Sequence, residues 1–310
     1  MAVVSFMQKL CIEEKLCPGT VAVYMAAVRY YFKISNLDIT FLESPWVSAA
    51  RTALNLIFRR DNPIAGRTGL PFTCDMIVHA KTRTCNTDSP VHQATVVAME
   101  VACACMLRVS EYLPGSPDAD HWVRGQDIAF RLVDERVVPS YQVWPSNLLL
   151  ADVVSAIVTV RSGKNDIEGA GNRFELPRAS VSASCAYDVV ADLYAWTIRA
   201  QPKLDKPFFT FRNQFTLSYD TLSAAIKKVA AEMGLDAARF RTHSLRIGGA
   251  SMMAAAGRPD YEIQKLGRWK SLAFLGYIRL GKATFKASLE AIANPTLLTV
   301  QDVSRMYAGA

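Results

Sequence analysis

The chain has 310 residues, with 35 lysines and arginines against 28 aspartates and glutamates, so its formal net charge is +7 and its pI is near 9.0. That length allows one large domain or two ordinary ones, and the basic balance weakly favours a polyanionic partner. Hydrophobic residues make up 51% of the chain, which is ample for a core, yet no stretch reaches the roughly 18 apolar residues of a membrane span.

The cysteines argue against both a disulfide framework and a zinc site. There are seven, an odd number, and they are scattered along the chain, which favours a reducing intracellular compartment. No Cys-x-x-Cys pair occurs and the four histidines are dispersed, so we expect no bound metal.

The first part of the chain predicts helices over residues 3–15, 18–33 and 46–60. Pro18 and Gly19 open the second helix, with Thr20 as its expected N-cap. Residues 61–69 then break the periodicity with a proline and two glycines, as an interdomain linker does. We therefore expect a small helical domain over residues 1–66 and a second domain over residues 67–310.

The second domain mixes helices with a few strands. Helical patterns cover residues 71–80 and 93–113, and the pattern is helical again from residue 186 onward, including residues 218–233, 242–256 and 261–266. Strand-like runs cover residues 122–133, 152–160 and 173–176. Between the last two, Gly163 and Lys164 have the chemistry of a hairpin turn. The predicted fold class is mainly α with a small antiparallel β-sheet, an α+β architecture.

The segment from Arg241 to Gly249 is the most informative stretch. With Thr242 as N-cap, His243 and Arg246 are three residues apart and share one helix face, where free backbone N–H groups favour an anion. Gly248 and Gly249 each cost a helix about 1 kcal/mol against alanine, which indicates close packing on a neighbouring backbone. An ordinary helix surface explains the histidine and arginine almost as well.

A second arginine stands in the apolar run of residues 102–113. Burying the Arg108 cation there is unfavourable without a partner, and Glu111 lies three residues further on. A plain salt bridge between the two accounts for the pattern. Both a salt bridge and a functional role can hold if Glu111 orients the guanidinium toward a phosphate.

Several further segments follow in a fixed order along the chain. They are TVAVYMAAVR (20–29), GLPFT (69–73), LRVSE (107–111), SGKND (162–166), HSLRIGGAS (243–251), GRWKS (267–271) and FLGYIR (274–279). Taken together they resemble the tyrosine recombinase family of phage integrase-like enzymes. The likeness is greatest to the recombinases of eukaryotic DIRS-type and Crypton-type mobile elements, and it spans nearly the whole chain.

The resemblance implies a cofactor-free transesterification. Tyr277 would attack a DNA phosphate, forming a 3′-phosphotyrosine and releasing a 5′-hydroxyl. Arg108 and Arg246 would hold the non-bridging oxygens through charge-assisted hydrogen bonds, for which arginine suits better than lysine. Lys164 would protonate the departing oxygen. His243 would hydrogen-bond the phosphate or accept the tyrosine proton.

One position departs from the family pattern. A histidine or tryptophan usually lies nine residues before the nucleophile, whereas Arg268 holds that position here and Trp269 lies eight residues before Tyr277. We favour Trp269 as the residue beside the phosphate, with Arg268 as the alternative donor. Without the other motifs, a packed aromatic on an amphipathic helix explains Tyr277 better.

The resemblance also implies a partner. The two domains would close as a clamp on double-stranded DNA in a DNA-containing compartment, the nucleus in a eukaryote. A homo-oligomer is expected, as a dimer on one site and a tetramer on two, with no membrane association. Candidate DNA-contacting residues are Arg29, Lys33, Arg59, Arg60 and Arg241. A solvated basic surface is the alternative for each of them.

The sequence therefore predicts a site-specific DNA recombinase that passes through a Holliday junction. Two alternatives remain: a type IB topoisomerase-like relaxation of supercoils, and a DNA-binding relative that no longer cuts. The ordered set of basic residues and the tyrosine argues against the second. The likeness to mobile-element recombinases argues against the first.

Overall fold

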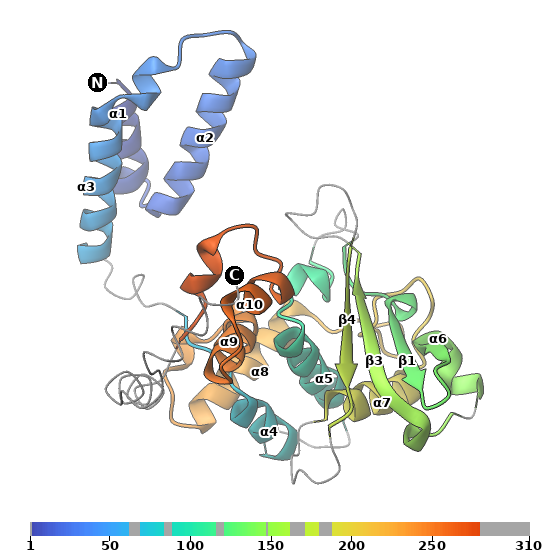
Figure 1. Ribbon diagram of the computed structural model, residues 1–310. Helices are drawn as coiled ribbons and strands as arrows, with labels where there is room; N and C mark the ends of the chain where they lie inside the picture. Colours follow the sequence, from blue (N-terminus) through green and yellow to red (C-terminus); the bar gives the residue numbers. More distant parts are fainter. Residues whose placement is uncertain are drawn as a thin grey trace, which may run out of the picture. The chain divides into compact units, whose positions relative to one another are not determined.

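The computed structural model describes residues 2–61, 69–83, 89–115, 121–146, 148–161, 171–179 and 188–279 (Figure 1). By its internal contacts the chain divides into two units, Met1–Thr68 and Gly69–Ala310. The mainly helical fold class with one small antiparallel sheet is confirmed. None of the described helices is both long and apolar enough to cross a lipid bilayer.

The first unit is built from three helices, as the periodicity predicts. These are α1 (Ala2–Gln8), which continues as a π-helical segment Lys9–Glu13, then α2 (Pro18–Ile34) and α3 (Pro45–Asp61). Its small core contains Met7, Val21 and Leu54. Cys17, rather than Thr20, is the N-cap residue of α2, because Pro18 already takes the first helical position.

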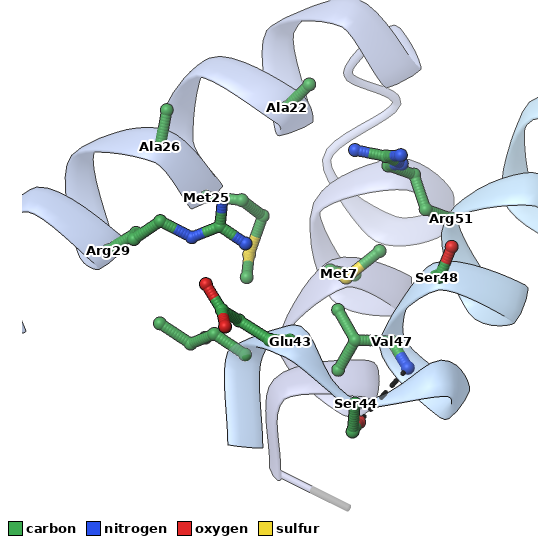
Figure 2. Close-up of a pocket in the computed structure, with 11 residues that line it drawn as sticks. Met7, Ala22, Met25, Ala26, Arg29, Glu43, Ser44, Val47, Ser48 and Arg51 are labelled. Carbon is green, nitrogen blue, oxygen red and sulfur yellow. Dashed lines mark hydrogen bonds between the residues drawn. The ribbon is translucent and has the colours of Figure 1, made fainter. Parts of the chain in front are cut away.

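A groove of about 450 Å³ separates α2 from α3 in this unit (Figure 2). Small side chains such as Ala22, Ala26 and Ser48 line it and leave the space open. Arg29, Glu43 and Arg51 contribute the charged groups of its lining.

The second unit surrounds α5 (Pro90–Ala104), whose residues 94–103 are all buried. Four helices pack against α5: α4 (Cys74–Arg83), α7 (Val189–Ala200), α8 (Tyr219–Glu232) and α9 (His243–Ala255). The short helix α10 (Asp260–Leu266) contacts α9. The core is therefore organised around one apolar helix from which the chain runs directly to Arg108.

The sheet has the strand order β2-β1-β3-β4 and is antiparallel throughout. Its strands are β1 (Ile128–Leu132), β2 (Val137–Pro139), β3 (Val153–Val160) and β4 (Asn172–Pro177), and the short helix α6 (Ser140–Val143) follows β2. The register between β3 and β4 runs from Ser155↔Pro177 to Val160↔Asn172, so these two strands pair as predicted, and the predicted turn with Gly163 and Lys164 lies outside the described residues. Strand β2 is an addition to the prediction.

The predicted helix over residues 93–113 is too long. Helix α5 ends at Ala104, and Met106 has a φ of +47°, a left-handed conformation that a non-glycine residue adopts at some cost. A 3₁₀ turn, Val109–Glu111, follows, and its N-cap residue Arg108 has extended backbone angles. Arg108 therefore lies beyond the helix end and not within an apolar helix.

The predicted close packing of the two glycines of α9 is confirmed. A Cβ added at Gly249 would lie 2.2 Å from the Cys103 carbonyl oxygen, and one at Gly248 would lie 2.0 Å from that of Phe72. Both neighbours are backbone atoms, so no rotamer change relieves the overlap. Helix α9 thus packs directly on the backbone that leads to Arg108.

Gly249→Ala should destabilise the second unit by about 1–3 kcal/mol, because the overlap with the Cys103 carbonyl outweighs the helix propensity that alanine adds. Urea unfolding measures the difference. Gly115→Ala is the matched control, since nothing lies within 4 Å of its added Cβ. Equal stability of the Gly249→Ala variant and the wild type would contradict the packing described here.

Candidate active site

Helix α9 begins at His243 and carries two residues of the candidate site, His243 and Arg246. Thr242 is the N-cap residue of α9, as predicted, but it has helical backbone angles and its side chain makes no capping hydrogen bond. Instead the Ser244 hydroxyl accepts from the Arg241 backbone N–H at 3.0 Å. The His243 ring keeps exposed surface, whereas Arg246, one turn along, is completely buried.

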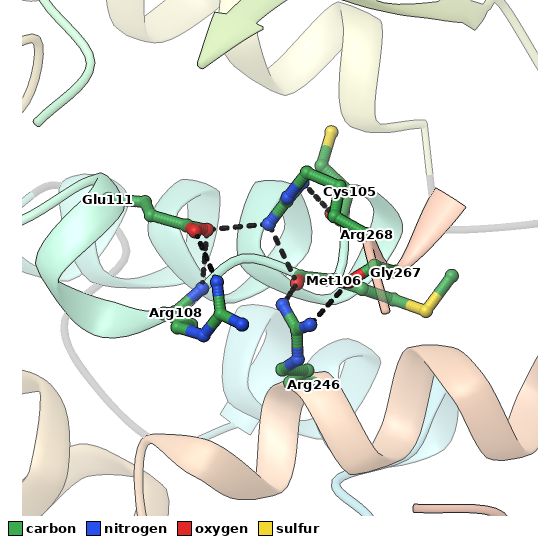
Figure 3. Close-up of polar contacts among 7 residues, drawn as sticks. All are labelled: Cys105, Met106, Arg108, Glu111, Arg246, Gly267 and Arg268. Carbon is green, nitrogen blue, oxygen red and sulfur yellow. Dashed lines mark hydrogen bonds and ion pairs between the residues drawn. The ribbon is translucent and has the colours of Figure 1, made fainter. Parts of the chain in front are cut away.

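The Arg246 guanidinium is held by two backbone carbonyls. One terminal nitrogen donates to the Met106 oxygen and the other to the Gly267 oxygen (Figure 3). Its central carbon lies 4.4 Å from the Trp269 ring centroid and 5.7 Å from the Tyr277 ring centroid. These cation–π contacts and carbonyls stabilise the buried cation, and no carboxylate within the described ranges forms an ion pair with it.

Glu111 is the carboxylate at the centre of the site, and its side chain is only 1% exposed. Its Oε1 accepts from Arg108 Nη1 at 3.0 Å, and its Oε2 accepts from the Arg108 backbone N–H at 2.8 Å and from Arg268 Nη2 at 2.6 Å. The salt bridge that the three-residue spacing predicts is therefore present. The Glu111 carboxylate also binds a second arginine, Arg268, which the spacing does not indicate.

Arg268 points into the protein. Its backbone is left-handed, with a φ of +57°, and its terminal nitrogens also donate to the carbonyls of Cys105 at 3.2 Å and Met106 at 3.3 Å. The guanidinium lies 5.1 Å from the Phe174 ring centroid of β4. This arginine thus joins the turn after α10 to the end of α5.

Tyr277 follows a 3₁₀ turn, Leu272–Gly276, and does not lie on an amphipathic helix. Its ring centroid is 4.8 Å from that of Trp269 and 5.1 Å from that of His243. The Ser251 hydroxyl of α9 donates to the Tyr277 carbonyl at 3.2 Å and accepts from the Arg279 N–H at 2.9 Å. Of the two residues considered for the place beside Tyr277, Trp269 makes the ring contact.

The site carries more positive than negative charge. Among the described residues, the guanidiniums of Arg108 and Arg268 contact the carboxylate of Glu111, and that of Arg246 shares the Met106 carbonyl with Arg268 (Figure 3). Burial, together with the nearby charges of Arg108 and Arg268, lowers the pKa of Arg246 to about 10. Burial, then Arg246 and Arg108, lowers the pKa of His243 as well. An anion bound here relieves this repulsion.

None of the contacts described above involves a side chain of the remaining candidate residues. Arg29 and Lys33 are exposed on α2, and Arg60 forms an exposed ion pair with Asp61 at 2.8 Å, all in the first unit. Arg241 is exposed just before α9. Lys164 and the Arg59 side chain lie outside the described residues. Across the described ranges, no group of three or more His, Cys, Asp or Glu side chains is arranged to hold a metal ion.

Two features of the site escaped sequence reasoning. The Met106 carbonyl accepts from both Arg246 and Arg268, yet a backbone oxygen gives no signal in the sequence. Ser251 lies within the HSLRIGGAS segment, where its position two turns after His243 was the available clue.

No family model matches the sequence, and no curated protein matches it. The chain is similar to the crystal structure of XerA recombinase, at 13% identity and a TM-score of 0.47, over 94% of this chain and 82% of that chain. It is also similar to XerH site-specific recombinase bound to palindromic difH substrate in a post-cleavage complex, at 14% identity and a TM-score of 0.48, over 73% of this chain and 54% of that chain.

A pre-cleavage complex of XerH with difH substrate is similar at 12% identity and a TM-score of 0.45, over 88% of this chain and 70% of that chain. At these sequence identities and TM-scores, the structural likeness supports no statement about the activity of this chain. We therefore infer the function from the geometry of the site.

His243 should titrate below pH 6.5, because burial and two nearby guanidiniums disfavour its charged form. The unfolded chain then binds the proton more readily. The contribution of neutral His243 to the free energy of unfolding is therefore fully present above pH 6.5, and it is lost as the pH falls through 6.5 toward the folded pKa. NMR of the imidazole resonances, assigned with a His243→Gln variant, measures this.

Arg108→Gln removes one of the two guanidinium charges that lower the pKa of His243, so this pKa should rise toward 6.5. Arg136→Gln, an exposed arginine paired with Asp134, should leave the pKa unchanged. A wild-type pKa at or above 6.5 would refute the electrostatic description of this site.

Proposed function

We propose that this chain is a site-specific DNA recombinase that cleaves and rejoins strands through Tyr277. The observation that supports the proposal is the surplus of guanidinium charge directly beside a tyrosine and a histidine with a lowered pKa. A phosphodiester is the anion that such a set suits, since its charge increases in the transition state and it offers a phosphorus for attack.

In the proposed reaction the Tyr277 oxygen attacks phosphorus and the bond from phosphorus to the 5′-oxygen breaks. The product is a 3′-phosphotyrosine and a free 5′-hydroxyl, so the phosphodiester bond energy is kept for rejoining. Neutral His243, whose ring centroid lies 5.1 Å from that of Tyr277, accepts the tyrosine proton or donates to the phosphate. Lys164 protonates the departing oxygen.

Arg108 and Arg246 are proposed to bind the non-bridging oxygens. Arg108 is suited to this because its side chain is 25% exposed while Glu111 fixes one of its nitrogens. Arg246 is covered by the rings of Trp269 and Tyr277, and its Nε has no hydrogen-bond partner in the part of the chain that the structure describes. The two rings must shift for a phosphate to reach it.

We further propose that the partner is double-stranded DNA, bound with Arg29, Lys33, Arg59, Arg60 and Arg241 among the contacts to its backbone, as a dimer on one site and a tetramer on two. The sequence segments favour the integration or excision of a mobile element, with the nucleus as the compartment in a eukaryotic host. No nucleotide cofactor is required, because the energy of the broken phosphodiester bond is kept in the phosphotyrosine.

A nicked suicide substrate carrying candidate element ends tests the nucleophile. The wild type should form a covalent protein–DNA adduct that survives a denaturing gel, since loss of the short strand prevents rejoining. Tyr277→Phe should form none, because it lacks the attacking oxygen. Tyr261→Phe is a matched control, as this tyrosine is 67% exposed on α10 and lies outside the cluster.

An adduct with Tyr277→Phe would show that another residue is the nucleophile. Absence of any adduct from the wild type on all element ends would favour a non-cleaving DNA-binding protein. Relaxation of supercoiled plasmid without paired sites would instead favour the topoisomerase-like activity.

Lys164→Ala should slow adduct formation by roughly 10²- to 10⁴-fold on ordinary DNA, because the leaving alkoxide loses its proton donor. A substrate with sulfur at the bridging 5′ position should restore the rate, since a thiol, with a pKa near 8.5, leaves without a proton. Single-turnover rates on the two substrates measure both effects. An equal loss on the sulfur substrate would assign Lys164 to binding.

A further inference from the structure

We propose that Arg268 is a positioning residue of this site, which acts through Glu111 on Arg108 and makes no contact with the phosphate. Its guanidinium serves as the permanent counter-ion of Glu111 and fixes the turn at Cys105 and Met106. The assignment rests on the proposed function, because it gives Arg268 an effect on cleavage.

The direction of the Arg268 side chain argues against contact between its guanidinium and the phosphate. The left-handed backbone at this residue turns the side chain inward, where it is only 10% exposed. Both terminal nitrogens donate to protein acceptors, and the guanidinium lies 5.1 Å from the ring centroid of Phe174. The strained backbone persists because these contacts hold it.

The contacts of Arg268 hold the segment 105–111 at both ends. At its start, the carbonyls of Cys105 and Met106 accept from Arg268, and at its end the carboxylate of Glu111 does. Arg108 lies between these points, and both its backbone N–H and its side chain donate to Glu111. Fixing the segment therefore fixes the place from which Arg108 reaches a phosphate.

The charges explain why a second arginine is needed. Glu111 is buried, so its carboxylate requires a compensating cation at all times. If Arg108 were its sole partner, turning toward a phosphate would leave that carboxylate unpaired. Arg268 stays on Glu111 at 2.6 Å, which leaves Arg108 able to share its guanidinium with the substrate.

A lysine at position 268 cannot make all of these contacts. Arg268 reaches two carbonyls and a carboxylate with two separate nitrogens, whereas a lysine offers one nitrogen. We therefore expect the order wild type, Arg268→Lys, Arg268→Gln for the rate of cleavage, although the lysine variant keeps the charge.

The test compares cleavage with DNA binding in Arg268→Gln, Arg268→Lys, Glu111→Gln and the Arg268→Gln/Glu111→Gln double variant. The single-turnover rate of adduct formation on the nicked substrate should fall by about 100-fold in Arg268→Gln, as expected when a reacting group is misplaced by about 1 Å. The salt dependence of DNA affinity should not change. The double variant should be no slower than the slower single variant, since both act through one contact.

Hydrogen exchange of the peptide over residues 105–111 supplies a readout that is independent of activity. It should be faster in Arg268→Gln than in the wild type and unchanged in Arg136→Gln, whose side chain is 72% exposed. If Arg268→Gln does not fold, all of these measurements are made on Arg268→Lys instead.

Three results would overturn the proposal. A salt slope reduced by about 1 in Arg268→Gln would mean that Arg268 contacts a phosphate. A wild-type adduct rate in this variant, or unchanged hydrogen exchange of residues 105–111, would mean that it positions nothing. If the wild type itself forms no adduct, the proposed function fails, while the exchange measurement still decides whether Arg268 holds this segment.

Discussion

The shared carboxylate of Glu111 is the interaction on which the site depends. It is buried at the end of a 3₁₀ turn, and it accepts from Arg108 through backbone and side chain and from Arg268 through its side chain. A buried ion pair of this kind contributes little net stability, because desolvation offsets the attraction. What it contributes is geometry, since the end of α5 and the turn after α10 are tied to one point.

The break at the end of α5 makes this arrangement possible. The left-handed Met106 residue points its carbonyl toward both Arg246 and Arg268, and Gly249 lets α9 approach the same backbone closely. A helix that continued through residue 113 would use that carbonyl for its own hydrogen bonds. The local strain at Met106 and Arg268 is therefore offset by hydrogen bonds from two buried cations, each of which would otherwise lose an acceptor.

Much of the fold follows from local patterns, while the site follows only in part. Residues 18–33 and 153–160 show helix and strand periodicity, and the packing of Gly248 and Gly249 follows from their cost in a helix. The end of α5 was not predicted, because residues 105–113 contain no proline or glycine and are mostly apolar. Three-residue spacing predicted the Arg108–Glu111 pair, but the inward turn of Arg268 depends on a backbone angle and on acceptors more than 150 residues away in the sequence, as Glu111 is.

The complete burial of Arg246 has a consequence for the fidelity of the recombinase that we propose. Under the proposed function, the free protein keeps a principal phosphate ligand beneath the rings of Trp269 and Tyr277, so a chance phosphodiester or a water molecule meets an incomplete site. Displacing the rings requires binding energy from contacts elsewhere along the DNA. Fidelity would then come from the ground state of the protein: a duplex that makes too few contacts leaves the site closed, and its strands stay intact.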